Sequence, residues 1–217
     1  MTSKRTDLIK LSFQEEVGNV ISHGVMVALL LMLLPIIAIR SYLIGGPILA
    51  FGNSVFIIAL ILMFLASTLY HSMAFDSKHK VIFRILDHIF IFVAIAGTYT
   101  PVALYAISGV WGIVILIIQW TCVISGVLYK VLAKSYNKKI TLAIYLIMGW
   151  SALFFLPVII SKTSPIFLGL IALGGILYTI GTWFYAQKTR PYFHFIWHIF
   201  INLAAISHLV AVIFFLV

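Results

Sequence analysis

Two histidines, His194 and His198, lie four residues apart in the otherwise apolar stretch PYFHFIWHIF, residues 191–200. Positions four apart share one face of a helix and are separated by about 6 Å along its axis, so both imidazoles can bind a single ion. A third histidine, His71, follows Ser67 at the same spacing in STLYH. Three neutral imidazoles with one open position form the ligand set of a catalytic zinc site, whereas structural zinc sites close with four protein ligands.

An aspartate, Asp87, can complete this chemistry. Its carboxylate could orient an imidazole through a hydrogen bond, or act as a general base toward water at the metal. Ser67 would place its hydroxyl one helical turn deeper than His71 on the same face. We therefore predict His71, His194 and His198 as metal ligands. On spacing alone, a hydrogen-bonded polar network of the same residues is the alternative interpretation.

The elements that must position these residues are transmembrane helices. Of the 217 residues, 64% are hydrophobic and only 9% are charged, which excludes an ordinary soluble domain. Uncharged stretches long enough to cross about 30 Å of hydrocarbon recur along the chain. The seven expected spans are 20–39, 48–70, 85–107, 110–128, 140–160, 166–186 and 192–217. We predict an all-α integral membrane protein, a single seven-helix bundle over residues 1–217, with turns at 45–47 and 164–165.

The distribution of lysine and arginine predicts the orientation of this bundle. Of the 14 basic residues, only Arg40 and Lys162 fall on the side opposite to all the others. The N-terminal segment, residues 1–19, is therefore expected in the cytoplasm and the C-terminus outside. The net charge of +9 is explained by this topology, so no nucleic-acid partner is expected.

Several other polar residues fall near the cytoplasmic ends of the expected spans. Glu16, Asn19 and His23 follow spacings of three and four, which makes a single stripe at the start of the first span. His208 lies ten residues beyond His198, about 15 Å deeper along the helix axis, and should miss a cluster at the cytoplasmic end. His23 and His208 are interpreted as packing residues, and the sequence assigns no chemical role to the four residues Glu16, Asn19, His23 and His208.

Taken together, these motifs resemble those of the hemolysin III proteins, which belong to the progestin and adipoQ receptor (PAQR) superfamily. EVGNVISH, residues 16–23, is similar to the E-x-x-N-x-x-x-H signature near the first helix of that family. STLYH, DHIFIF and HFIWH resemble its S-x-x-x-H motif, its third-helix aspartate motif and its H-x-x-x-H motif. The resemblance spans nearly the whole chain. One departure is Phe195, which stands where the family commonly has a polar residue.

The resemblance implies a seven-helix fold with a cytoplasmic N-terminus and a zinc ion near the cytoplasmic leaflet. Carried over residue by residue, it implies His71, His194 and His198 as zinc ligands, with Asp87 and Ser67 beside the water at the open position. The long N-terminal extension of the animal receptors has no counterpart here, which favours a compact bacterial-type member in the plasma membrane.

We expect a zinc-dependent hydrolase that cleaves an amide or ester bond of a membrane lipid near the cytoplasmic leaflet. Asp87 would accept a proton from water, and Ser67 would stabilise the developing oxyanion or hold the water. Related receptors and alkaline ceramidases make an amide-type lipid plausible. The expected partners are therefore a membrane lipid and, in a homo-oligomer, further copies of this chain.

Two other functions are compatible with parts of the pattern. The first is a non-catalytic protein, either a membrane-perturbing cytolysin or a factor in membrane-lipid homeostasis, in which a structural zinc ties the second and seventh helices together. A wide pore would need polar residues through the whole bilayer, and here they thin out toward the external side. The second is haem ligation, but a histidine pair at i and i+4 on one helix does not suit both axial sites of one haem.

Overall fold

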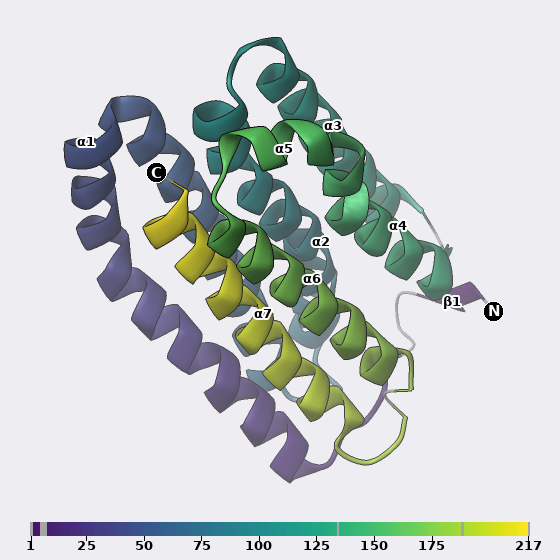
Figure 1. Cartoon of the computed structure of the whole chain (residues 1–217). Coiled ribbons are helices and arrows are strands. Elements are labelled where there is room, and N and C mark those ends of the chain that lie inside the picture. Colours follow the sequence, from purple (N-terminus) through teal and green to yellow (C-terminus); the bar gives the residue numbers. More distant parts are fainter. Residues whose placement is uncertain (1, 5–7, 134, 188, 217) are drawn as a thin grey trace.

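The computed structural model describes residues 2–4, 8–133, 135–187 and 189–216, and most of them are helical (Figure 1). The α-helices are α1 (Phe13–Ser72), α2 (Lys78–Pro101), α3 (Gly109–Leu132), α4 (Lys138–Trp150), α5 (Leu156–Lys162), α6 (Pro165–Ala186) and α7 (Phe193–Phe215). A π-helical segment, Val102–Ile107, continues α2, and a 3-10 segment, Ser151–Phe155, joins α4 to α5. The strands β1 (Thr2–Lys4) and β2 (Ser135–Asn137) pair antiparallel, with Thr2 opposite Asn137.

Within the described residues, six helices are long and apolar enough to cross a membrane. They are Phe13–Ser72, Lys78–Ile107, Gly109–Leu132, Lys139–Lys162, Pro165–Ala186 and Phe193–Phe215. The helical fold class predicted from composition is therefore confirmed. The first of the six helices contains both the first and the second expected span, because the backbone remains largely helical through the turn between them.

This first helix, α1, is bent at Gly46 into two arms that lie side by side (Figure 1). A straight helix of 60 residues would be about 90 Å long. Yet Glu16, near its start, is 2.5 Å from His71, near its end. Gly46 has φ 73° and ψ −168°, a backbone conformation that is essentially restricted to glycine. The turn predicted at residues 45–47 is thus confirmed, and it brings the two ends of α1 together.

Two helices begin earlier than expected because of their N-caps. Ser12 and Glu15 form a reciprocal capping box that starts α1 at Phe13 rather than at the expected residue 20. The Ser77 hydroxyl accepts a hydrogen bond from the backbone N–H of Lys80 and starts α2 at Lys78 rather than at residue 85. From the sequence, Lys78, Lys80 and Arg84 were assigned to the loop after the second span and the start of the third. In the structure, both Lys80 and Arg84 are buried side chains of α2.

The second arm of α1 lies at the centre of the bundle, where Phe56, Ile57, Leu60 and Phe64 are fully buried. α2 approaches it closely at Gly97, where an added Cβ would lie 2.5 Å from Cβ of Ala59. Close packing of small residues is a common way for membrane helices to associate. The packing holds the end of this arm, and with it His71, in a defined position relative to α2.

Candidate metal centre

Three imidazoles from two separate parts of the chain converge in the bundle interior. His71 comes from the end of the second arm of α1, and His194 and His198 come from the first two turns of α7. The Nε2 atom of His194 lies 3.3 Å from Nε2 of His71 and 3.2 Å from Nε2 of His198. All three rings are at least 94% buried. The structure therefore brings the predicted trio together.

The arrangement fits a metal ion. A tetrahedral zinc ion with Zn–N bonds of about 2.0–2.1 Å holds its nitrogen ligands about 3.3–3.4 Å apart, and the two measured Nε2–Nε2 distances are 3.3 and 3.2 Å. One ligand atom from each of the three residues lies within 4.8 Å of those of the other two. Hydrogen bonds alone explain this less well, because Nε2 of His194 has either one proton or one lone pair and yet contacts two other ring nitrogens. The cluster can hold a metal ion.

A carboxylate that the sequence left without a role orients one of these rings. Glu16 Oε2 lies 2.5 Å from Nδ1 of His71, and Glu16 Oε1 accepts a hydrogen bond from Nζ of Lys80 at 2.7 Å. When Nδ1–H of His71 donates to this carboxylate, Nε2 keeps its lone pair and faces the other two rings. The sequence indicated that Glu16, Asn19 and His23 share one face of α1, but it did not indicate that this face meets the trio.

The other two members of the stripe also contact the trio. The side-chain amide of Asn19 lies 3.4 Å from Nδ1 of His71. The ring of His23 stacks on that of His198, with centroids 3.8 Å apart and an interplanar angle of 25°, and meets Phe64 edge-on at 4.9 Å. His23 therefore packs as expected, but it packs against a predicted ligand.

The start of α7 is tied directly to the start of α1. Tyr192, which precedes α7 with φ 61°, donates its backbone N–H to Oε1 of Glu15 at 2.7 Å. Phe195 packs against Gly18, where an added Cβ would lie 2.9 Å from the phenyl ring. The apolar residue between the two histidines thus serves helix packing, while the carboxylate beside the trio is supplied by Glu16.

The two remaining predicted site residues lie beside the trio. Ser67 and Asp87 are both buried, and together with His23 they line one cavity of about 130 Å³. The Ser67 hydroxyl has no hydrogen-bond partner among the described residues. The cavity adjoins the trio through His23, whose ring stacks on that of His198.

Two of the remaining histidines, His88 and His208, make contacts away from the trio. His88 contacts the backbone oxygen of Arg84 through Nδ1 at 2.5 Å and the hydroxyl of Tyr185 through Nε2 at 3.0 Å. His208 packs against α6, where its Nε2–H donates to the backbone oxygen of Ile171 at 3.1 Å. The expectation that His208 misses the cluster agrees with this position.

Comparison with known proteins gives consistent matches over most of the chain. The family model described as "Haemolysin-III related" matches residues 11–209. The "Hemolysin-3 homolog" of Bacillus subtilis (strain 168) is 35% identical over 190 residues, which cover 88% of this chain and 89% of that protein. "Hemolysin-3" of Bacillus cereus is 34% identical over 202 residues, 93% of this chain and 91% of that protein.

A more distant match is the human "Monocyte to macrophage differentiation factor", 28% identical over 155 residues, which cover 69% of this chain and 64% of that protein. Together with the six apolar helices, the matches show that the chain is a multi-pass integral membrane protein.

Proposed function

Because the chain belongs to the haemolysin-III related family, we propose that it is a zinc-dependent hydrolase that cleaves an amide or ester bond of a membrane lipid. The observation that supports this most directly is the convergence of three buried imidazoles, with two Nε2–Nε2 distances that match the spacing of tetrahedral zinc ligands. A zinc ion bound there would polarise water and the carbonyl group of a substrate.

The roles proposed for the neighbouring residues follow from their positions. Asp87 accepts a proton from the attacking water, since it lines the cavity beside the trio. The Ser67 hydroxyl, which has no partner among the described residues, donates a hydrogen bond to the developing oxyanion or holds the water. Glu16 keeps His71 in the tautomer whose Nε2 faces the trio.

A membrane lipid is the proposed substrate because the cavity is largely apolar. Beyond Ser67 and Asp87 it is lined by side chains such as Ile91, Ala94 and Ile95 of α2. A hydrocarbon chain can be buried there favourably, while its carbonyl end lies at the trio.

We also propose that the chain crosses the membrane seven times, with a cytoplasmic N-terminus. Each arm of α1 exceeds the roughly 20 residues that one crossing needs. Arg40 lies at the bend end of α1 and donates to the backbone oxygen of Ile213. The N-terminal strand β1 instead pairs with β2, between α3 and α4, in a connection rich in lysine. This distribution of basic residues between the two ends of the bundle supports a cytoplasmic position for the trio.

A non-catalytic function is the second candidate. It is favoured by one specific observation, because the trio joins α1 to α7 and a metal bound there would tie the two helices together. Two relatives carry names that refer to haemolysis. In this case the protein perturbs membranes or takes part in membrane-lipid homeostasis.

The test begins with the metal content of protein purified in detergent without chelator. We expect about one zinc ion per chain in the wild type, its loss in His198→Ala and its retention in the control His88→Ala, which changes a histidine outside the trio. A lipid-amide and lipid-ester hydrolysis screen then follows with wild type and His198→Ala. Absence of metal from the wild type would contradict the proposal. Stoichiometric zinc without turnover of any lipid would favour the non-catalytic function.

A further inference from the structure

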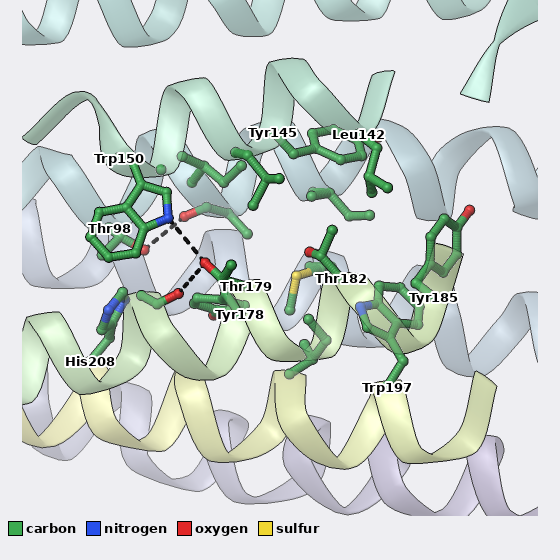
Figure 2. A pocket seen from close by; sticks show the side chains of 18 of the residues that line it. Thr98, Leu142, Tyr145, Trp150, Tyr178, Thr179, Thr182, Tyr185, Trp197 and His208 are labelled. Carbon is green, nitrogen blue, oxygen red and sulfur yellow. Dashed lines mark hydrogen bonds between the residues drawn. The ribbon is translucent and has the colours of Figure 1, made fainter. Parts of the chain in front are cut away.

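The cavity beside the trio is long and follows several helices into the bundle. Along α2 its lining runs from Asp87 to Tyr99, an axial distance of about 18 Å. Figure 2 shows Tyr185 and Trp197 at one end of the cavity and Trp150 and His208 at the other. An acyl chain whose carbonyl group lies at the trio would therefore reach His208 partway along its length.

His208 presents an acceptor atom at that far end. Its Nε2 lies 3.1 Å from the backbone oxygen of Ile171; since a carbonyl oxygen can only accept, Nε2 is protonated and Nδ1 of the neutral ring is an acceptor. Nδ1 is buried and has no hydrogen-bond partner among the described residues, and the residue is only 9% exposed. The ring is held in place because an added Cβ at Gly174 would collide with it.

Three polar side chains that line the cavity near His208 already have partners. Trp150 donates its indole N–H to the Thr179 hydroxyl at 3.0 Å, and Thr179 donates to the backbone oxygen of Gly175 at 2.8 Å, as Figure 2 shows. The Thr98 hydroxyl donates to the backbone oxygen of Ala94 at 2.9 Å. A buried acceptor without a partner is costly, so Nδ1 of His208 suits a neutral donor carried by a ligand.

A second cavity, of about 70 Å³, continues past this point. It shares Thr98, Tyr99, Gly149 and His208 with the first cavity, and otherwise has a mainly apolar lining. Examples of that lining are Val102, Ile107, Ile115, Phe155 and Phe167. Hydrocarbon can therefore lie on both sides of His208. A ligand group that donates a hydrogen bond to His208 would thus lie in the middle of a hydrocarbon chain rather than at its end.

We propose that His208 is a specificity-determining residue whose Nδ1 accepts a hydrogen bond from a hydroxyl group near the middle of a lipid acyl chain. The position of the carbonyl end rests on the proposed function, because it assumes that the reacting group lies at the trio. Binding of the hydroxyl group to His208 itself requires neither zinc chemistry nor turnover.

The test measures fatty-acid binding to the full-length protein in detergent by displacement of a fluorescent fatty acid. The competitors are stearic acid, a hydroxystearic acid with its hydroxyl near mid-chain, and one with its hydroxyl beside the carboxyl group. One net hydrogen bond in a buried site predicts that the wild type binds the mid-chain form about two- to tenfold more tightly than stearic acid. The form hydroxylated beside the carboxyl group should show no such gain.

Two variants of the same residue test the assignment. His208→Phe should bind stearic acid and lose the preference for the mid-chain hydroxyl, whereas His208→Asn, whose amide oxygen can replace Nδ1 as acceptor, should retain part of it. Equal binding of the three acids by the wild type would overturn the proposal, and so would an unchanged preference in His208→Phe. If His208→Phe binds none of the acids, the comparison rests on the wild type and His208→Asn. A preference for the mid-chain isomer in both proteins then supports the proposal, and absence of this preference from either protein overturns it.

Zinc content and lipid hydrolysis, measured on the same preparations, separate this inference from the proposed function. A mid-chain preference in a protein without zinc or turnover leaves the His208 subsite standing while the hydrolase fails. Zinc and turnover without the preference refute the subsite alone.

Discussion

Replacement of Glu16 by glutamine tests how the metal centre is held together. In the structure one carboxylate serves two groups, since Oε2 contacts Nδ1 of His71 at 2.5 Å and Oε1 accepts from Nζ of Lys80 at 2.7 Å. Glu16→Gln preserves the shape of the side chain but removes the negative charge and one of the two acceptors. Both the orientation of His71 and the environment of Lys80 should change.

The expected loss of metal affinity follows from the contact with His71. Loss of a hydrogen-bonded partner of a ligating histidine lowers metal affinity by about 10–100-fold, which corresponds to about 1.4–2.8 kcal/mol. A second cost arises at Lys80, which is 1% exposed. Its ammonium group would keep the backbone oxygen of Met73 at 3.1 Å and the ring of Tyr70 at 5.0 Å. The amide keeps one acceptor oxygen, so where its NH2 group faces Lys80, loss of a hydrogen bond to a charged group costs about 1.5–3 kcal/mol of stability.

Two measurements separate these effects. Zinc affinity is obtained by competition with a chromophoric chelator, and stability by thermal unfolding in the same detergent. Adding Lys80→Met to Glu16→Gln removes the unpaired ammonium group, so stability should recover while metal affinity remains low. The control is Asp76→Asn, which makes the same change of charge at an exposed residue between α1 and α2.

The result that would refute this reasoning is wild-type zinc affinity in Glu16→Gln, measured beside a His198→Ala variant that has lost the metal. The tautomer and orientation of His71 would then be set by a group other than Glu16.

Three further substitutions test the proposed chemistry and the fold. Ser67→Ala should lower kcat for lipid hydrolysis by about a hundredfold while zinc content stays at the wild-type level; equal kcat would exclude a catalytic Ser67. Gly174→Ala forces a Cβ into the His208 ring and should cost about 1–3 kcal/mol of stability. Gly46→Ala should cost a similar amount, about 1–3 kcal/mol, because of the backbone conformation at the bend of α1. Thermal unfolding checks both glycine variants against Gly149→Ala, whose Cβ would meet nothing within 4 Å; stability equal to that control would contradict the packing or strain argument concerned.

Much of the helical architecture could be predicted because a membrane restricts the solutions. Backbone groups in hydrocarbon must be paired within the chain, so long apolar stretches without charge indicate helices. The helix boundaries were harder to predict where charged residues indicated one starting point and the N-cap residue set another. Lys80 was expected before the span 85–107, yet it lies within α2, because Ser77 caps that helix earlier and because Glu16 stabilises the ammonium group of Lys80 inside the bundle.

The candidate ligands could also be predicted, because the sequence by itself determines local geometry. His194 and His198 share a helix face at a spacing of four, and Ser67 and His71 do the same. The bend at Gly46 was visible as well, since glycine and proline adjoin at the turn between two apolar stretches.

Only the tertiary structure decided which of these faces meet. Glu16 contacts a histidine 55 positions away in the chain, and His208 lies where two cavities adjoin. Neither relation has a local sequence signal, because helix periodicity determines which residues share a face and says nothing of the angle at which two helices pack. That angle follows from side-chain packing over the whole interface, such as the contact of Gly97 with Ala59. Helix packing therefore places the polar stripe of α1, to which the sequence assigned no role, against the candidate metal centre.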